Sequence, residues 1–194
     1  MDLFSFDHIP PFYKGNQDEP HGINMIVETP RGTRNKFAYK EEYGVMELRR
    51  VLRGGMVWPC DFGFVPQTLA EDGDAIDVAL LIDEPCFPGC LVRARVLGSL
   101  GLKKNGDQND RLIACPISLP GSASTWDEIR VLSDLSPRLL SELEGFLKDY
   151  QTFEGNEIEL SGFNDEGVAL QSVRAAHIAW LARNNKGLNQ DAGT

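Results

Sequence analysis

The stretch Glu71-Asp72-Gly73-Asp74-Ala75-Ile76-Asp77-Val78 decides how this chain is interpreted. It places three aspartates within six residues, directly before an apolar run, with Gly73 as a turn between them. Carboxylates this close repel one another unless a positive charge lies among them. Mg²⁺ is such a charge, because it takes one or two carboxylate oxygens together with water and substrate phosphates. The stretch therefore indicates a magnesium–phosphate site at the start of a buried strand, with a solvated acidic turn as the alternative.

Basic residues on the preceding segments fit the same interpretation. Glu28 and Lys36 flank a turn that contains Pro30 and Gly32, and Arg50 follows on a later segment. Lysine and arginine bind phosphate oxygens while carboxylates hold metal ions, so this mixture is typical of a metal–phosphate site. Taken singly, Lys36 and Arg50 are more often surface residues.

The apolar pattern predicts strands in the first part of the chain and helices in the second. Short apolar runs bounded by Gly, Pro and Asn predict strands at residues 23–27, 36–39, 45–48, 76–81, 90–96 and 111–114. Ser136 followed by Pro137 predicts a helix start, and apolar residues then recur at helical spacing. A second helix is predicted from about Asn164 to Gly187. Its core-facing residues would be Ala169, Val173, Ala176 and Trp180. This order predicts an α+β, mainly β protein, namely a mostly antiparallel barrel with helices packed outside.

The composition is that of an acidic globular protein. The 194 residues carry 19 Lys and Arg against 29 Asp and Glu, a net charge of −10, and 42% of them are hydrophobic. We expect residues 1–194 to form a single domain, with an N-terminal arm at 1–20 and a flexible tail at 187–194. The acidic balance argues against a nucleic-acid partner, since phosphate backbones need a basic surface. A small phosphate ligand is still compatible, because metal ions can supply the positive charge.

The sequence also predicts the compartment. No apolar stretch approaches the ~18 residues that a spanning helix needs, and the first residues lack the basic start and apolar run of a signal peptide, so we expect no membrane partner. The cysteines at positions 60, 86, 90 and 115 form no CxxC pair and have no histidine cluster that could complete a zinc site. We expect them to be reduced and mostly buried in a cytoplasmic protein.

The order of the motifs resembles that of the soluble, family I inorganic pyrophosphatases. The motifs are Glu28…Lys36, Arg50, Trp58–Gly63, Pro66–Thr68, Asp72–Asp77, Pro88-Gly89…Arg93, the hairpin at 102–112, the helix with Tyr150, and Ser161–Phe163. They span roughly residues 22–180, and the signature around the three aspartates is the most specific of them. The family prefers Pro or Glu where this chain has Ala75. The resemblance implies a closed, five-stranded antiparallel barrel of the oligonucleotide-binding (OB) type with two C-terminal helices packed outside.

The same resemblance implies an activity and a set of site residues. The activity is Mg²⁺-dependent hydrolysis of pyrophosphate to two phosphates by a homo-oligomer. The metal-site carboxylates would be Asp72, Asp77, Glu28 and Asp74, and Asp74 would also be the general base toward a metal-activated water. The substrate-binding residues would be Lys36, Arg50, Arg111 and Tyr150.

Several of these site positions depart from the family pattern. Ala38 stands at the position of a glutamate, Phe62 at that of a tyrosine and Gln151 at that of a lysine. In the hairpin at 102–112, an ungapped alignment puts Lys104 and Asn109 at the positions of two metal-binding aspartates. An ammonium at Lys104 could take the place of an outer Mg²⁺.

Two hypotheses from different classes follow. The first is a pyrophosphatase, with reduced efficiency or an altered demand for metal. The second is an impaired pyrophosphatase-like protein that binds a phosphate compound or a partner without efficient hydrolysis. Asp107 or Asp110 could replace a missing ligand if the hairpin tip is rearranged, and otherwise both are exposed tip residues.

Overall fold

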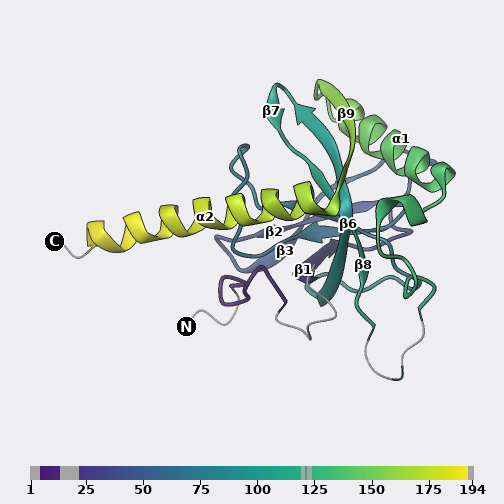
Figure 1. Cartoon of the computed structure of the whole chain (residues 1–194). Coiled ribbons are helices and arrows are strands. Elements are labelled where there is room, and N and C mark those ends of the chain that lie inside the picture. The colour runs from purple at the N-terminus through teal and green to yellow at the C-terminus, as the bar shows by residue number, and fades with distance from the viewer. Residues whose placement is uncertain (1–4, 14–21, 119–120, 122–123, 192–194) are drawn as a thin grey trace.

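The computed structural model describes residues 5–13, 22–118, 121 and 124–191 (Figure 1). The strands in this part of the chain are β1 (Gly22–Thr29), β2 (Asn35–Lys40), β3 (Val45–Val51), β4 (Asp61–Phe64), β5 (Asp77–Leu80), β6 (Leu91–Lys104), β7 (Asp107–Gln108), β8 (Arg111–Pro116) and β9 (Ile158–Asp165). The helices are α1 (Pro137–Phe153), α2 (Glu166–Asp191) and the short 3-10 helix η1 (Leu132–Asp134).

Among the described strands, five close into a barrel in the order β1-β4-β5-β8-β6. The barrel is closed because β1 pairs with β4 on one side and with β6 on the other. The long strand β6 continues beyond the barrel, where it pairs with β7 and β9. The closed five-stranded barrel with two helices against it is the fold predicted from the sequence.

One pair differs from the predicted antiparallel arrangement, because β5 and β8 run parallel. Along the chain, β6 lies between β5 and β8 and runs antiparallel to β8. Strand β8 therefore runs in the same direction as β5. Val78 therefore lies beside Leu112 and Leu80 beside Ala114. The barrel is a mixed one.

Two hydrophobic cores pack against opposite faces of the barrel wall. Val78 and Leu80 of β5 belong to the core that includes α2, whereas Ala79 and Leu81 belong to the core that includes α1. Strands buried on both faces carry continuous apolar runs, and the run at 78–81 is one of these. This explains why its sequence does not alternate between polar and apolar residues.

The two helices begin and end differently from one another. Ser136 is the N-cap of α1, where its hydroxyl accepts a hydrogen bond from the Leu139 amide, and Pro137 occupies the first turn as predicted.

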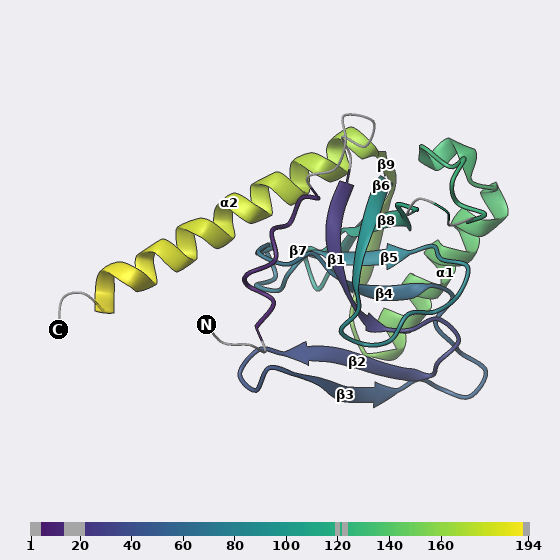
Figure 2. The same ribbon diagram turned by 90° about the horizontal axis from the view of Figure 1, so that it is seen from below.

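The buried residues of α2 are Ala169, Leu170, Val173 and Ala176, and Trp180 is only partly buried. The backbone of α2 continues through Gly187 to Asp191, so the predicted stop at Gly187 is wrong. Figure 2 shows its C-terminal half extending away from the barrel. None of the helices in the described ranges is long and apolar enough to cross a membrane.

The N-terminal arm, as far as residues 5–13 describe it, packs onto the barrel. The Phe6 ring lies 4.7 Å from the Tyr39 ring and 6.0 Å from the Phe64 ring, measured between centroids. The Gln67 side-chain amide donates to the Asp7 carbonyl, and Asn24 donates to the Pro10 carbonyl at 2.8 Å. The arm is therefore held at both ends of its described length.

Strand β4 was not predicted, and the reason is its glycine. A Cβ atom at Gly63 would lie 1.9 Å from the carbonyl oxygen of Ile26 on the neighbouring strand β1. Glycine is required here so that the two backbones can approach, although glycine in a sequence usually argues against a strand.

We predict that Gly63→Ala lowers the free energy of unfolding by about 1–3 kcal/mol, because β1 and β4 must separate to admit the new methyl group. The measurement is urea unfolding followed by circular dichroism. The matched control is Gly54→Ala, where the added Cβ meets no described atom within 4 Å. Equal unfolding midpoints for the two variants would contradict the close approach of β1 and β4.

Candidate active site

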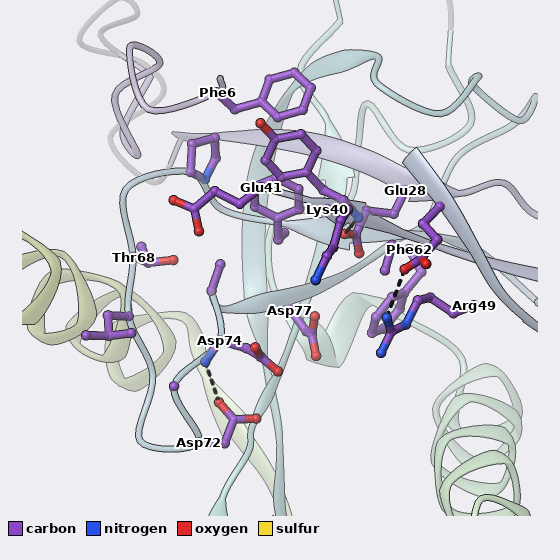
Figure 3. A pocket seen from close by; sticks show the side chains of 18 of the residues that line it. Phe6, Glu28, Lys40, Glu41, Arg49, Phe62, Thr68, Asp72, Asp74 and Asp77 are labelled. Carbon is purple, nitrogen blue, oxygen red and sulfur yellow. Dashed lines mark hydrogen bonds and ion pairs between the residues drawn. The ribbon is translucent and has the colours of Figure 1, made fainter. Parts of the chain in front are cut away.

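A cleft of about 690 Å³ lies between the β2–β3 hairpin and the loop that precedes β5. The residues that the sequence predicted as a site all line it, namely Glu28, Lys36, Arg50, Asp72, Asp74, Asp77, Arg111 and Tyr150. They come from β1, β2, β3, the loop before β5, β5 itself, β8 and α1. Folding thus brings together side chains that are up to about 120 residues apart, and Figure 3 shows the three aspartates projecting into the shared space.

The acidic loop is held in shape by hydrogen bonds between its side chains and its backbone. The Thr68 hydroxyl donates to the Val65 carbonyl at 2.6 Å and accepts from the Ile76 amide at 3.0 Å, which ties the two ends of the loop together. Gly73 has a φ of +89°, in the region that favours glycine, and so permits the turn between two aspartates. The Asp72 carboxylate accepts a bond from the Asp74 amide at 3.2 Å.

Two of the predicted metal ligands, Asp72 and Asp77, contact polar side chains in this structure. Asp77 forms an ion pair with Arg111 at 2.7 Å, and the Asp72 carboxylate accepts a hydrogen bond from the Asn109 side-chain amide. Burial raises the pKa of Asp77, while the charge of Arg111 opposes that shift. Arg111 itself is buried and also donates to the Asn109 carbonyl at 2.9 Å.

Glu28 lies deeper, on β1. Its carboxylate accepts a hydrogen bond from the Tyr39 amide at 2.7 Å. Burial raises the pKa of Glu28 to about 8, and the nearby carboxylates of Asp77 and Asp74 add to the increase. A carboxyl group in such surroundings is stabilised in its charged form by a neighbouring cation.

Two cations of the site, Lys36 and Arg50, converge on one glutamate. Glu154, at the C-cap of α1, lies 3.6 Å from the Lys36 ammonium and 3.0 Å from Arg50 Nε. The Lys36 ammonium also donates to the Tyr150 hydroxyl. Burial lowers the pKa of Lys36, and Glu154 opposes that shift. Burial raises the pKa of Tyr150, so its hydroxyl stays protonated as a hydrogen-bond donor.

The donor set fits a hard divalent cation, although it is not preassembled. Among the described residues, no three His, Cys, Asp or Glu side chains are grouped closely enough to hold a metal ion. In this structure the carboxylates of Asp72 and Asp77 instead contact protein donors, Asn109 and Arg111 respectively. Nevertheless, Glu28, Asp72, Asp74 and Asp77 share one cleft, and carboxylate oxygens are the ligands that Mg²⁺ prefers.

Comparisons with known proteins identify the family of the chain. The model of the family described as inorganic pyrophosphatase matches residues 25–181. The chain belongs to the inorganic pyrophosphatase family. It is 36% identical over 155 residues to the inorganic pyrophosphatase of Halalkalibacterium halodurans, covering 80% of this chain and 93% of the relative. It is 34% identical over 161 residues to that of Methanosarcina acetivorans, covering 83% and 94%. The crystal structure of the inorganic pyrophosphatase from Thermus thermophilus superimposes with a TM-score of 0.76 at 30% identity, covering 88% of this chain and 97% of that one.

The two hairpin positions that the sequence analysis identified as departures from the family pattern lie at the site. Lys104 lines the cleft, and Asn109 contacts Asp72, as the ungapped alignment predicts. Asp110 is occupied elsewhere, since its carboxylate accepts from the Leu102 amide at 3.0 Å and from Gln108 at 2.5 Å. Asp107 is an exposed residue of the hairpin strand β7. Neither aspartate is among the described residues that line the cleft.

The other departures also lie at the cleft wall, where Ala38, Phe62 and Gln151 contribute to its lining. Phe62 is buried, with its ring centroid 5.0 Å from that of Trp58 and 5.9 Å from the Arg111 guanidinium carbon. Gln151 accepts a hydrogen bond from Asn156 at 2.9 Å, which turns its amide oxygen toward the turn after α1.

Sequence reasoning missed several charged residues of the cleft, among them Lys40, Arg49 and Glu154. Glu154 could have been found from its place four residues after Tyr150, one turn along the same helix. Lys40 could have been found from its spacing to Lys36 on one strand face. Arg49 could not have been found from the sequence. In a regular strand consecutive side chains point to opposite faces, so Arg49 would be assigned to the face opposite Arg50.

His177 on α2 makes a specific contact with the segment that leads into the acidic loop. Its Nδ1 lies 2.8 Å from the Gln67 carbonyl oxygen, and the Leu69 amide donates to the Ala176 carbonyl at 3.0 Å. Gln67 has a φ of +54°, which is uncommon for a residue with a side chain. Helix α2 therefore holds the start of the acidic loop.

We predict that the double variant Lys104→Asp with Asn109→Asp binds more Mg²⁺ than the wild type, because it restores two carboxylates at the cleft. Without metal the double variant should unfold at a lower temperature than the wild type, because the new carboxylate at position 109 would bring a like charge to Asp72. Added Mg²⁺ should raise the melting temperature of the double variant more than that of the wild type. Calorimetric Mg²⁺ titration and melting curves measure both effects. The control is Lys103→Asp, which changes the charge at an exposed neighbouring position on β6 that is not among the cleft-lining residues. Unchanged stoichiometry would contradict the alignment of the hairpin.

Proposed function

We propose that this protein hydrolyses inorganic pyrophosphate to two phosphates with the help of Mg²⁺. The observation that carries the proposal is the convergence of Asp72, Asp74 and Asp77 with three cations in one cleft. The cations are Lys36, Arg50 and Arg111, and they come from three different strands. Membership of the inorganic pyrophosphatase family supports the same reaction and a divalent metal cofactor.

The proposed metal-holding residues are Asp72, Asp77, Glu28 and Asp74. Bound Mg²⁺ would supply an acidified water molecule and would neutralise charge on the substrate. Asp74 is the proposed general base, because its carboxylate lies exposed in the cleft on the turn formed by Gly73.

Substrate binding is assigned to Lys36, Arg50, Arg111 and Tyr150. Pyrophosphate carries its charge on oxygens that accept charge-assisted hydrogen bonds from these side chains. The Lys36 ammonium and the Arg50 guanidinium are aligned by Glu154, which fixes their spacing before the substrate arrives. Such preorganised cations stabilise the charge that develops on the transferred phosphoryl group and its leaving group.

A second candidate function is phosphate binding without efficient turnover. It is favoured by the contacts of Asp77 with Arg111 and of Asp72 with Asn109, since both carboxylates already have protein partners. In this case, the protein would bind pyrophosphate or phosphate but release inorganic phosphate slowly.

A homo-oligomer is also part of the proposal. Its support is the family resemblance, together with exposed apolar side chains on α2 such as Ile178, which is 66% exposed, and Leu181. The cytoplasmic location stays a prediction from the four cysteines, which are free of disulfides in the structure.

The test of the function is phosphate release from pyrophosphate with millimolar Mg²⁺, compared with release from a nucleoside triphosphate. Rapid release from pyrophosphate alone supports the proposed hydrolase. Binding of pyrophosphate in calorimetry without release supports the second candidate. Faster release from the nucleoside triphosphate would contradict both.

We predict that Asp74→Asn reduces turnover by about 10²–10⁴-fold, the usual contribution of a general acid or base. Affinity for pyrophosphate should fall much less than turnover, since the substrate-binding residues are unchanged. The control is Asp107→Asn, the same change on the exposed hairpin strand, which should leave turnover unaffected. Undiminished hydrolysis by Asp74→Asn would remove Asp74 from the role of base.

A further inference from the structure

A β-bulge in the β2–β3 hairpin turns Arg49 toward the cleft. Lys36 pairs with Arg50 and the next residue, Phe37, pairs with Leu48. Arg49 is therefore an extra residue of β3 that is not paired with any residue of β2. Side chains of a regular strand alternate between its faces, which would place only one of two consecutive arginines in the cleft. At a bulge this alternation is interrupted. Arg49 and Arg50 both line the cleft, whereas Leu48 is an exposed residue outside it.

Arg49 faces the acidic loop from the opposite wall. Figure 3 shows its guanidinium directed toward the space in front of Asp77, and its charge interacts with that of Asp74. Its Nη1 forms an ion pair with Glu47 Oε2 at 2.8 Å. Glu47 lies on the same strand and also lines the cleft.

Lys40 is a second cation on this wall. It lies on the same face of β2 as Lys36, two residues beyond Ala38, and Figure 3 shows its ammonium directed between Asp77 and Asp74. Its ion pair with Glu42 is 3.5 Å long.

The partners of these two cations distinguish them from the inner ones. The carboxylates that hold Lys36, Arg50 and Arg111 are well covered, because the side chain of Glu154 is 10% exposed and that of Asp77 25%. The carboxylates that hold Arg49 and Lys40 are 46% and 61% exposed. Exposed ion pairs contribute little to stability, so an incoming anion can displace the carboxylate at Arg49 or Lys40 more easily than at the inner cations.

We propose that Arg49 and Lys40 form an outer anion site of the cleft, which binds a phosphate group of the substrate directly and does not require a divalent cation to do so. Arginine suits this role because its planar guanidinium makes two parallel hydrogen bonds to a phosphate. The inference rests on the proposed function for the identity of the substrate, and it concerns binding rather than hydrolysis.

The test is calorimetric titration of inorganic pyrophosphate and of inorganic phosphate into the full chain, in EDTA and at low ionic strength. The wild type should bind pyrophosphate under these conditions. Arg49→Gln should weaken that binding at least about tenfold, because the loss of even one hydrogen bond to a charged group has that effect. Lys40→Gln should weaken it by a smaller factor, because its ammonium acts as a single point charge. Glu47→Gln should strengthen it, since that change frees Arg49 and removes a negative charge.

Two further variants control for net charge and for folding. Arg53→Gln changes the net charge equally, at an exposed arginine that stacks on Phe153 and is not among the cleft-lining residues, and it should leave binding nearly unchanged. Arg49→Lys keeps the positive charge but lacks the planar guanidinium that can donate two parallel hydrogen bonds. Its affinity for pyrophosphate should therefore lie between those of the wild type and Arg49→Gln. Melting curves establish that each variant is folded.

Equal affinities of Arg49→Gln and Arg53→Gln would overturn the outer site, as would a wild type that binds no pyrophosphate in EDTA. Hydrolysis by the wild type in Mg²⁺ is measured separately. A protein that does not hydrolyse pyrophosphate but loses EDTA-resistant binding in Arg49→Gln would contradict the proposed function and leave the outer site supported.

Discussion

The parallel pairing of β5 with β8 is the constraint on which the site depends. Asp77 begins β5 and Arg111 begins β8, and in a parallel pair the two strands begin at the same edge. Their side chains therefore meet there in a 2.7 Å ion pair. An antiparallel pairing would have placed Asp77 opposite the far end of β8. Since Arg111 is buried and would lose its partner if Asp77 were removed, this contact also links the stability of the barrel to its chemistry.

The sequence predicted the parts of the molecule that depend on local chemistry. The acidic loop, the cap at Ser136 and the buried run at 78–81 each follow from neighbouring residues, and each is present. The eight predicted site residues also share one cleft, although their individual roles stay predictions.

Features that depend on contacts between distant segments were not predictable in this way. β4 exists because Gly63 lets it approach β1, and β9 (Ile158–Asp165) forms because the overhanging end of β6 offers it an edge. The direction of β8 depends on the path of β6 across the barrel. The bulge at Arg49 is a property of the pairing between β2 and β3, and neither strand alone specifies it.

The packing of the N-terminal arm has a practical consequence for handling the protein. Phe6 rests on the ring of Tyr39, and the backbone amide of Tyr39 holds the carboxylate of Glu28. Phe6 and Asp7 also form part of the cleft lining. Trimming the chain to the barrel, or cleaving it by protease during purification, would thus remove a support of the site while leaving the barrel strands in place.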